Sequence, residues 1–459
     1  MEDLRHYLNE IREHYSDEFY EISETIIPEY EATAWWRELI KFNNPILFFQ
    51  HVRGYDMHVV ANVFGTLERV ARMIGAKPSN IYDVWIEKTK NAVNPVIVDD
   101  GPVKENIYSG SNVNVFKLPV LKFFREDGGR YITSGIVVAN DPETGLVNLS
   151  FARMVVKEPN KLGLSIHSRG NLWHYYQKAV RNGLPWLDAA VVIGCHPTIY
   201  LAAATRKTDE YKLAGALAGS PVDLVRCETK DIYVPAHSEI VLEGRILTGV
   251  TEDEGPFSEF TGYVSGRSTR NVMHVDCITK RHNSIYQTII PSKSSEHLLL
   301  GGLPFHAAVY AKLKESIPQV CGVNFPLWGT HFVAVISVDK HGKEGVQIRA
   351  ALRLIGEDPY VKYVIVVDND VDVYDDFEVL WAVATRSQPN KNIHVIDVTD
   401  GSMLDPSQEK AGLSSRAIID ATKPPHMENI AVPSIPENIM EKIRTSIKKT
   451  FNKAIISGK

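Results

Sequence analysis

The chain has 459 residues, more than one hydrophobic core usually serves, so two or three domains are expected. Hydrophobic residues at 44% and charged residues at 23% are typical of a soluble globular protein. The 50 Lys and Arg against 56 Asp and Glu give a net charge of −6. The sequence shows no basic stripe with interleaved aromatic residues, which argues against nucleic acid as the main partner.

The sequence also gives no sign of a membrane span or of secretion. The longest apolar stretch, 189–205, is interrupted by Gly194-Cys195-His196-Pro197, so we expect two short buried elements and a turn. The first four residues lack the basic and apolar regions of a secretion signal. The four cysteines are scattered, with no Cys-x-x-Cys, as in a reducing compartment. We therefore expect a cytoplasmic protein with no membrane partner.

Residues 1–110 have the pattern of an N-terminal α/β segment. Leu4, Leu8 and Ile11 fall on one face of a helix, and residues 66–74 predict a second helix. Two apolar runs between these helices predict strands; they span 45–50 and 58–63.

Residues 111–300 have the pattern of a β-rich domain. Short apolar runs separated by turns predict strands over 113–116, 131–139, 146–156 and 162–166. A helix is expected over 173–182. Strands at this spacing favour a barrel or a sandwich, and the mouth of a barrel is a common ligand site.

Residues 301–459 have the pattern of an α/β domain. Strands predicted at 332–338, 362–368 and 393–398 alternate with helical stretches near 346–355 and 377–385. This rhythm predicts a parallel sheet with helices packed on it. In the tail, isoleucine or phenylalanine recurs every fourth residue, at Ile439, Ile443, Ile447, Phe451 and Ile455. A helix with such a stripe needs a partner surface, either a second subunit or a neighbouring domain.

The predicted fold class is therefore α+β or α/β and multidomain. A central split β-barrel-like domain is flanked by an N-terminal α/β segment and by a C-terminal α/β domain with a terminal amphipathic helix.

The stretch from Thr251 to Tyr263 is the strongest candidate for chemistry. Glu254 and Glu259 lie five residues apart across Gly255-Pro256, a pair that favours a turn and can direct two carboxylates into one cavity. Three aromatic residues would give this cavity apolar walls: Phe257, Phe260 and Tyr263. Desolvation there would raise a carboxyl pKa toward the range of an acid/base catalyst. An acidic surface loop is the alternative.

A second cluster precedes this stretch. Asn148 and Arg153, followed by Ser165-Ile-His167-Ser-Arg169-Gly-Asn171, suit an anionic ligand such as a phosphate. Asn148 and Arg153 have opposite parity, so one ligand reaches both only where the strand twists, bulges or ends. A surface arginine and a turn asparagine are the alternative.

Glu210 stands at the head of a run of small residues. Its carboxylate could bind a hard divalent cation together with an amide or an imidazole. A glutamate that merely starts a helix is the alternative.

An apolar strand ending in Asp368-Asn-Asp370 is similar to the nucleophile motif of haloacid-dehalogenase-type phosphatases. Asp372 departs from the residue usual at its place in that motif, and aspartate at a strand end is also ordinary capping. A phosphatase using Asp368 therefore remains an alternative function.

Taken together, the segments Asn148 to Arg153, Glu210 and Glu254-Gly-Pro-Phe-Ser-Glu259 make the chain resemble the UbiD-like decarboxylases. Further segments look like family sequence: Tyr233 to Gly244, Thr261-Gly262-Tyr263, Val366-Val367-Asp368, Trp381 to Arg386 and Asp420-Ala421-Thr422. The resemblance extends from about residue 30 to 425. It implies a lyase that uses prenylated FMN to remove or add CO₂ at aromatic, heteroaromatic or α,β-unsaturated acids.

Carried over by position, the resemblance makes Arg153, Glu254 and Glu259 the catalytic trio. Glu259 would donate the proton, while Arg153 and Glu254 would hold and tune the flavin. It implies cofactor binding by Asn148, Ser150, Phe151, Ala152, Arg153, His167, Ser168, Arg169, Glu210 and Arg416. A Mn²⁺-like ion would be bound by Asn148, Glu210 and His167, with Asn171 as the alternative third ligand, and a K⁺-like ion would lie nearby.

The resemblance also implies partners. These are a small carboxylic acid and CO₂, a flavin prenyltransferase that supplies the cofactor, and further copies of the chain in a homodimer or homohexamer. Candidate pocket residues are Trp328, His331, Phe257 and His297, and Ser295 stands where several relatives have Asp. A non-catalytic subunit of a carboxylase complex is a further alternative, against which the intact Arg153, Glu254 and Glu259 argue.

Overall fold

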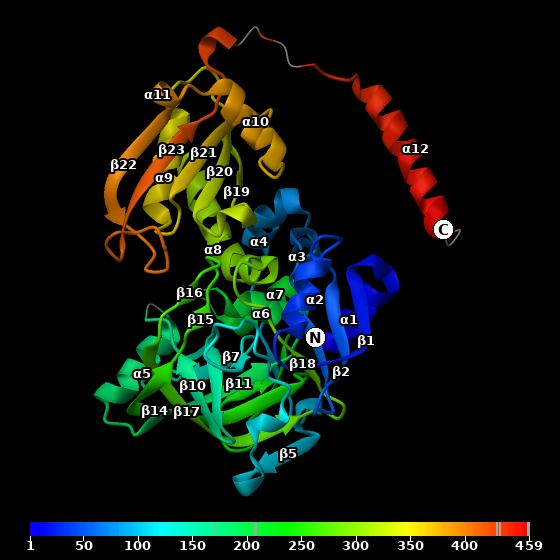
Figure 1. Ribbon diagram of the computed structural model, residues 1–459, viewed down its shortest axis with the longest axis vertical. Coiled ribbons are helices and arrows are strands. Elements are labelled where there is room, and N and C mark those ends of the chain that lie inside the picture. Colours follow the sequence, from blue (N-terminus) through cyan, green and yellow to red (C-terminus); the bar gives the residue numbers. More distant parts are fainter. Residues whose placement is uncertain (169, 206–208, 428–429, 431–432, 457–459) are drawn as a thin grey trace.

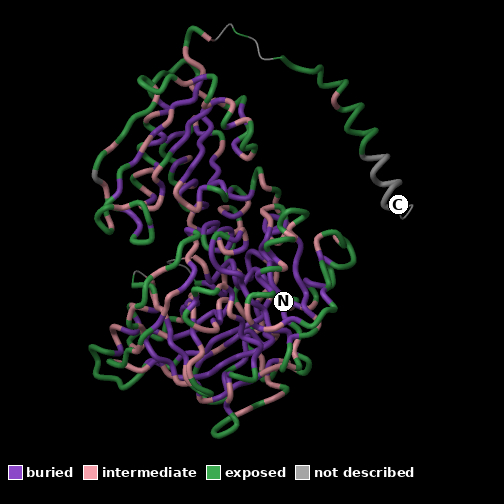
Figure 2. The backbone as a smooth tube through the Cα atoms, in the orientation of Figure 1, coloured by how far each residue is buried: buried purple, intermediate pink, exposed green. Residues whose placement is uncertain are grey.

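The computed structural model describes residues 1–168, 170–205, 209–427, 430 and 433–456, with the backbone alone for 398 and 448–456. The chain forms two bodies stacked along its long axis, with helix α8 (Ser295–Ser316) at their junction (Figure 1). Helix α12 (Glu437–Ile456) stands apart from both (Figure 1). Buried residues fill both bodies, whereas the described side chains of α12 are mostly exposed (Figure 2). No helix in the described ranges is long and apolar enough to cross a membrane.

The N-terminal part confirms the predicted elements. Its helices are α1 (Leu4–His14), α2 (Glu31–Leu39), α3 (Leu67–Met73) and α4 (Ile81–Thr89). Its strands are β1 (Phe19–Ile26), β2 (Ile46–Val52) and β3 (His58–Ala61). The apolar stripe of α1 is buried, as its spacing predicts. A distant strand, β18 (Ile285–Gln287), completes this four-stranded sheet by pairing in parallel with β3.

The central sheet has nine strands in the order β6-β9-β10-β17-β14-β11-β7-β8, with β5 paired to β17. Their bounds are β5 (Asn106–Ser109), β6 (Tyr131–Ile132), β7 (Ile136–Asn140), β8 (Val147–Phe151), β9 (Arg153–Glu158), β10 (Lys161–Ser165), β11 (Trp186–Ile193), β14 (Ile240–Glu254) and β17 (Ser268–Lys280). Strands β8 and β9 lie near opposite ends of this order, yet only Ala152 separates them in the chain. The sheet therefore has to curl into a half-barrel, which agrees with the predicted split barrel.

Helices and small sheets complete the larger body. The helices are α5 (Asn171–Arg181), α6 (Pro197–Ala203) and α7 (Glu210–Ala218). The small sheets join β4 (Val96–Ile97), β12 (Asp223–Arg226) and β13 (Tyr233–Pro235), and β15 (Phe257–Ser258) with β16 (Val264–Ser265). The apolar stretch 189–205 forms the end of β11, a turn and α6, as predicted, and all of it is buried except the partly exposed His196, Ala204 and Thr205. Because β4 and β5 pair with later strands, the segment before residue 110 is structurally continuous with the central part.

Three strand predictions in this region are wrong in detail. The strand predicted over 131–139 is divided into β6 and β7 by residues 133–135. Residues 113–116, all described, form no strand; a 3-10 turn (Val115–Lys117) lies there instead, with Asn114 accepting a hydrogen bond from Phe116 N at 3.0 Å. This side-chain contact offers the backbone a local alternative to a sheet. The strand predicted over 146–156 breaks at Ala152 into β8 and β9.

The C-terminal body holds a five-stranded sheet in the order β19-β20-β21-β23-β22. The strands are β19 (Val320–Asn324), β20 (Val333–Val338), β21 (Tyr363–Asp368), β22 (Ile393–Asp400) and β23 (Leu413–Asp420); the helices are α9 (Val346–Glu357), α10 (Asp376–Arg386) and α11 (Pro389–Asn392).

The predicted all-parallel order of this sheet is wrong. Strand β22, expected as the third parallel strand, is an edge strand antiparallel to β23, and β23 takes the place beside β21. Periodicity identifies a strand but does not determine which strand it pairs with, and the largely exposed β22 fits an edge position.

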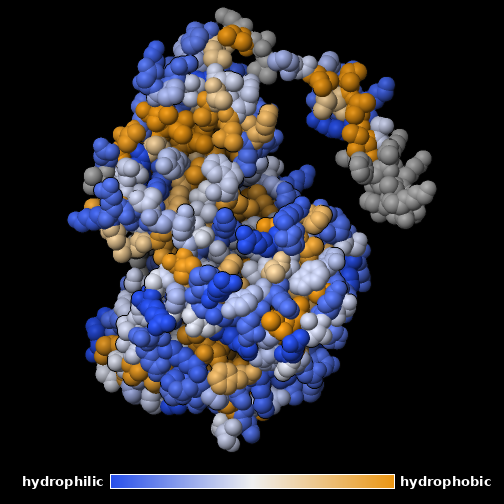
Figure 3. All heavy atoms as spheres, viewed as in Figure 1, coloured by the Kyte–Doolittle hydropathy of each residue, from blue (hydrophilic) through white to orange (hydrophobic). Residues whose placement is uncertain are grey.

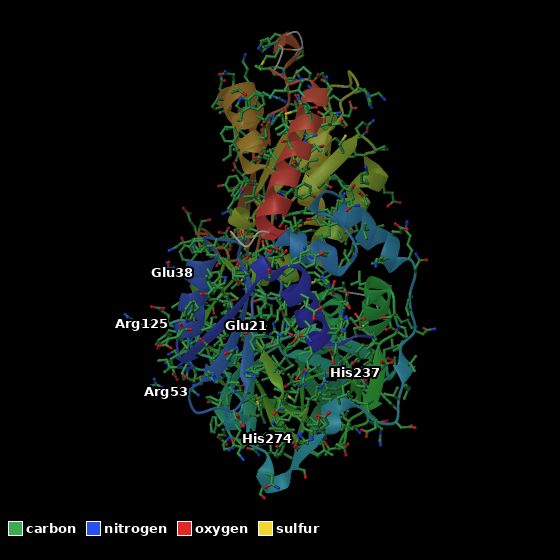
Figure 4. The ribbon with its side chains drawn as sticks, turned by 90° about the vertical axis from the view of Figure 1, so that its right-hand side faces the viewer. Glu21, Glu38, Arg53, Arg125, His237 and His274 are labelled. Carbon is green, nitrogen blue, oxygen red and sulfur yellow. The ribbon has the colours of Figure 1, made fainter. Side chains whose placement is uncertain are left out.

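The surface carries both charged and apolar side chains. Charged side chains such as Glu38, Arg53 and Arg125 point outward from the larger body (Figure 4). Apolar patches lie on the C-terminal body and on α12 (Figure 3). Exposed side chains there include Phe377 and Leu380 on α10 and Ile443 on α12.

Candidate active site

Arg153 joins the two glutamates of the predicted trio. Its Nε and Nη2 donate to the two carboxylate oxygens of Glu254 at 2.9 and 3.0 Å, and its Nη1 donates to Glu259 Oε1. Glu254 ends β14 and is 2% exposed, while Arg153 begins β9. The two-point contact fixes the guanidinium plane, and the adjacent carboxylates raise the pKa of Arg153 although burial opposes this. The structure therefore assembles a carboxylate–guanidinium–carboxylate cluster from segments that lie about a hundred residues apart.

The turn between the two glutamates is held by a neighbouring loop. Gly255 has φ +87°, a conformation that favours glycine. Asp127 Oδ1 accepts from both Ser258 N at 3.0 Å and Ser258 Oγ at 2.9 Å. Gly128 N donates to Pro256 O at 2.7 Å, and a Cβ on Gly128 would lie 2.4 Å from Gly255 O. Gly128 thus contacts the Gly255-Pro256 part of the predicted turn, and Asp127 holds Ser258, which follows it.

Aromatic rings cover one side of the cluster. The Arg153 guanidinium lies 4.7 Å from the centre of the Phe257 ring, which packs 4.7 Å from the Tyr131 ring. Burial, together with the negative charge of Glu254, raises the pKa of Tyr131. Phe257 forms an apolar wall as predicted. Tyr263 does not, because it is 63% exposed.

The cluster opens onto a cavity of about 880 Å³ between the two bodies. Its walls include predicted cofactor residues, namely Phe151, Ala152, Arg153, His167 and Ser168, as well as Glu259 and His297. The break of the strand at Ala152 places both Phe151 and Arg153 in this wall. Ala152 lines the same wall, whereas Asn148, whose parity is opposite to that of Arg153, does not.

Asn148 and Glu210, two of the predicted metal ligands, are both buried near Leu149. Asn148 is 3% exposed and donates from Nδ2 to Ser150 Oγ at 3.0 Å. Glu210 is 1% exposed, and neither of its carboxylate oxygens makes a hydrogen bond. Burial raises the pKa of Glu210 to about 8, although the amides of Glu210 itself and Leu149 lie close enough to oppose the shift. Buried carboxylate oxygens without a protein donor are suited to a cation.

The third ligand is not identified by these contacts. His167 lines the cavity, and the alternative, Asn171, is the first residue of α5. Among the described residues, no group of three or more His, Cys, Asp or Glu side chains is arranged to hold a metal. The predicted metal ligands would not form such a group, because only Glu210 and His167 are of these four residue types and the third ligand is Asn148. Arg169 lies outside the described residues.

Arg416, expected near a phosphate, is not itself one of the residues that line the cavity, but it contacts Pro359, which is. Its Nη1 donates to Asp358 O at 3.2 Å and also contacts Val361 O, while Nη2 donates to Pro359 O at 3.1 Å and Asp400 O at 2.5 Å. Arg416 is 2% exposed. These contacts satisfy main-chain carbonyl groups inside the C-terminal body, so we do not carry Arg416 into the proposed site.

Asp368 does not support the phosphatase alternative. Its carboxylate accepts from Lys423 N at 2.5 Å and lies 3.4 Å from Arg386 Nη1. Arg386 in turn forms a two-point contact with Asp370. These contacts connect β21 with α10 and with the segment after β23.

A second cavity of about 780 Å³ adjoins the first and shares His297, Gly301 and Tyr360 with it. Phe260, His306 and His331 line only the second of these two cavities. His297 and His331 were expected from the sequence, but His306 was not. Residues 359–360 and 401–404 of the C-terminal body, which line the first cavity, were not expected either. Their place there depends on how the two bodies face each other. The one local signal was Gly301-Gly302 within a helical pattern.

Comparison with known proteins gives a consistent result along the chain. The chain matches the family models of all three domains of 3-octaprenyl-4-hydroxybenzoate carboxy-lyase, UbiD. The N-terminal domain matches residues 14–89, the Rift-related domain residues 95–294 and the C-terminal domain residues 298–421.

Individual relatives agree. Phenolic acid decarboxylase of Sedimentibacter hydroxybenzoicus is 33% identical, covering 92% of each chain. Anhydromevalonate phosphate decarboxylase of Methanothermobacter thermautotrophicus is 32% identical, covering 92% of this chain and 97% of the relative.

Among solved structures, the UbiD-class enzyme HmfF from Pelotomaculum thermopropionicum in complex with FMN has a TM-score of 0.90 at 35% identity, covering 95% of this chain and 98% of HmfF. An evolved dimeric form of HmfF in complex with prFMN has a TM-score of 0.86 at 34% identity, covering 94% and 97%. The family resemblance inferred from the motifs is therefore confirmed. The chain belongs to the UbiD family and is an enzyme of its carboxy-lyase class.

Proposed function

We propose that the chain catalyses the reversible, non-oxidative decarboxylation of an aromatic, heteroaromatic or α,β-unsaturated acid with prenylated FMN, and that Glu259 is the proton donor. The observation that carries this proposal is the cluster of Arg153, Glu254 and Glu259, of which Arg153 and Glu259 line the large cavity. The presence of prFMN in a HmfF structure supports the choice of cofactor.

Several cavity residues fit the cofactor. Phe151, Ala152, Arg153, His167 and Ser168 supply apolar, cationic and polar groups around one volume, as a flavin ring with a phosphate tail requires. Asn148 and Ser150 lie on the adjoining strand. When bound, prenylated FMN supplies an electron-accepting ring for the electron pair that CO₂ leaves behind.

We propose that Asn148, Glu210 and His167 hold a divalent ion, Mn²⁺ in the first place, with K⁺ nearby. The two Glu210 oxygens without hydrogen-bond donors support this, because a hard cation would satisfy both. Such an ion would neutralise a buried carboxylate and a cofactor phosphate together.

The side chains of the cluster have separate tasks. The bond between the substrate carbon and its carboxylate breaks, CO₂ leaves, and the electron pair stays on that carbon. The protonated Glu259 carboxyl group gives its proton to the carbon and becomes a carboxylate, which Arg153 contacts as the structure shows. Glu254 keeps Arg153 in place through its two-point contact. In the carboxylation direction Glu259 removes the proton instead.

We further propose domain boundaries near residues 110 and 300, a cytoplasmic location and a flavin prenyltransferase as the supplier of the cofactor. Helix α12 would pack against a second copy of the chain in a homodimer or homohexamer. The exposed Ile439, Ile443 and Ile447 support this, since an apolar stripe favours a covering surface.

The direct test is co-expression with a flavin prenyltransferase, followed by the absorbance spectrum and mass of the bound flavin. A panel of conjugated carboxylic acids is then assayed for CO₂ release. We expect a flavin heavier than FMN and CO₂ from at least one acid. Protein that binds no such flavin and releases no CO₂ would refute the proposal.

Glu259→Gln tests the proton donor. Glutamine keeps an oxygen for Arg153 but has no acidic proton, so the variant should retain the flavin and lose turnover by roughly 10²–10⁴-fold. Glu252→Gln is the matched control, because Glu252 lies nearby in sequence, on β14, but pairs with Lys157 at 2.9 Å and Lys161 at 3.1 Å. Wild-type rates in Glu259→Gln would remove Glu259 from this role.

A further inference from the structure

Glu259 lies at the tip of a short hairpin, on the side of the larger body that faces the C-terminal body (Figure 1). Its strands, β15 and β16, have two residues each. Glu259 N donates to Tyr263 O and Gly262 N donates to Glu259 O, both at 2.9 Å. A two-stranded hairpin is only marginally stable by itself. Packing of the tip against its surroundings therefore determines where the proposed proton donor lies.

Phe260, the next residue of the tip, packs against three rings of the C-terminal body. The centre of its ring lies 5.2 Å from that of His331 and 6.1 Å from those of Phe332 and Tyr360. At these distances aromatic rings attract each other. Tyr263, at the other end of the tip, is 63% exposed. The aromatic anchor of the tip is therefore Phe260.

His331 reaches this contact through an uncommon backbone. Thr330 has φ +45° and His331 has φ +66°, a conformation that residues other than glycine seldom adopt, least of all a β-branched one. Such a backbone persists where surrounding contacts offset its cost. Helix α8 supplies them: the His306 ring centre lies 5.3 Å from that of His331, and a Cβ on Gly302 would lie 2.6 Å from His331 Cε1. Burial lowers the pKa of His331 to about 4, so it packs as a neutral ring at neutral pH.

A buried arginine holds the segment that carries Tyr360. Arg416 donates to Asp358 O at 3.2 Å and to Pro359 O at 3.1 Å, and it also contacts Val361 O. Tyr360 N donates in turn to Asp358 Oδ1 at 2.7 Å. The residues on both sides of Tyr360 are therefore held, which gives Arg416 a task that needs no contact with a ligand.

We propose that Phe260 is a positioning residue: its ring, packed against three rings of the C-terminal body, holds the hairpin tip so that Glu259 lies against Arg153. The placement of the proton donor then depends on how the C-terminal body docks on the larger body. This inference rests on the proposed function for the role of Glu259 and adds what places that residue. The expected effect is on the rate, because a misplacement of about 1 Å can lower a rate by about 10²-fold.

The test removes a ring from each side of the contact. Phe260→Ala removes the anchor of the tip, and Phe332→Ala removes one of its partners. Phe260 lines the second cavity, whereas Phe332 is not among the described residues that line either cavity. Phe332→Ala therefore tests the contact without changing the cavity wall.

Two measurements are made on each variant loaded with its flavin. Hydrogen exchange of the peptide 257–265 reports on the tip, and kcat and KM are measured with an acid that the wild type decarboxylates. We expect faster exchange in both variants, the same amount of bound flavin, and a kcat about 10- to 100-fold lower in Phe260→Ala. KM should stay within about threefold of wild type. Phe260→Met, which keeps an apolar side chain that packs well on rings, should recover most of the rate.

A double variant shows whether the two rings act through one contact. If they do, Phe260→Ala combined with Phe332→Ala should lose no more kcat than Phe260→Ala alone. Phe305→Ala is the matched control, because Phe305 lines the second cavity and its ring centre lies 6.3 Å from that of His306. It should leave the exchange of 257–265 unchanged.

An unchanged kcat or an unchanged exchange in Phe260→Ala would overturn the inference while leaving a decarboxylase in place. Losses that multiply in the double variant would also overturn it, because the two rings would then act separately. A protein that binds no prenylated flavin and releases no CO₂ would instead refute the proposed function, and the exchange of 257–265 would still decide whether Phe260 holds the tip.

Discussion

Replacing Arg153 by Met should destabilise the protein chiefly by leaving Glu254 buried without a partner. Arg153 donates two hydrogen bonds to Glu254 and contacts Glu259, while Glu254 is 2% exposed. Removing one partner of a buried ion pair costs about 3–5 kcal/mol. The three charged hydrogen bonds of Arg153, at about 1.5–3 kcal/mol each, would together allow a larger loss, so they do not limit this value. We therefore expect Arg153→Met to lose about 3–5 kcal/mol of unfolding free energy.

The double variant separates the charge effect from the loss of packing. With Glu254→Gln added, no buried charge at position 254 is left unpaired. The double variant should therefore lose about 2 kcal/mol less unfolding free energy than the sum of the losses in the two single variants. Urea unfolding, monitored together with hydrogen exchange at the end of β14, measures the four corners of the cycle. Arg270→Met is the matched control in the same cavity, since Arg270 Nε contacts only Ser165 Oγ at 3.2 Å among the hydrogen bonds to side chains described for it.

Additive effects of the two changes would refute this reasoning. They would mean that Arg153 and Glu254 contribute independently and that the contact in the structure is not an energetic unit. A loss of stability in Arg270→Met as large as in Arg153→Met would equally show that burial of the methionine, and not the unpaired carboxylate, determines the result.

Three further predictions concern the turn, the half-barrel and the tail. Asp127→Asn should weaken the contact with Ser258 without abolishing it. Turnover should fall while the amount of bound flavin changes little. An unchanged kcat would contradict a role of Asp127 in positioning the turn between Glu254 and Glu259. Burial of Asp276 is outweighed by hydrogen bonds from groups such as Arg245, so its pKa is lowered. The contribution of the Asp276 carboxylate to stability is therefore present above about pH 4, and it is lost as the pH falls through the lowered pKa of the folded state. In urea unfolding at pH 7, Asp276→Asn should be less stable than wild type, and the difference in unfolding free energy should shrink toward pH 3. Deleting residues 437–459 should reduce the mass measured by light scattering to that of a smaller assembly; an unchanged mass would exclude α12 from the subunit contact.

Much of the fold could be read from local patterns. The spacing of Leu4, Leu8 and Ile11 specified the buried face of α1, and the apolar runs before residue 65 specified β2 and β3. The Gly255-Pro256 turn between Glu254 and Glu259 was equally local, because turn-forming residues act through their own backbone. In each case the signal and the structure involve residues close in sequence.

Strand pairing was not local. β22 has the composition of a parallel strand following a helix, yet it is antiparallel to β23 at the edge of the sheet. The break at Ala152 reflects the curl of the whole sheet, which brings β8 and β9 from opposite ends of its order to one place. Arg416 was assigned near a phosphate by position, but the carbonyl groups that surround it belong to two separate segments, 358–361 and Asp400.

The sequence by itself thus determined which residue types were available for the chemistry and which helix and strand faces are buried. Only the tertiary structure decided that Arg153 holds Glu254 across 101 positions of sequence, and that Gly301 and four imidazoles border the continuation of the same cavity. The physical reason is that periodicity records the burial of each element separately. Contacts between distant elements depend on how sheets curl and bodies face each other, and no single segment carries that information.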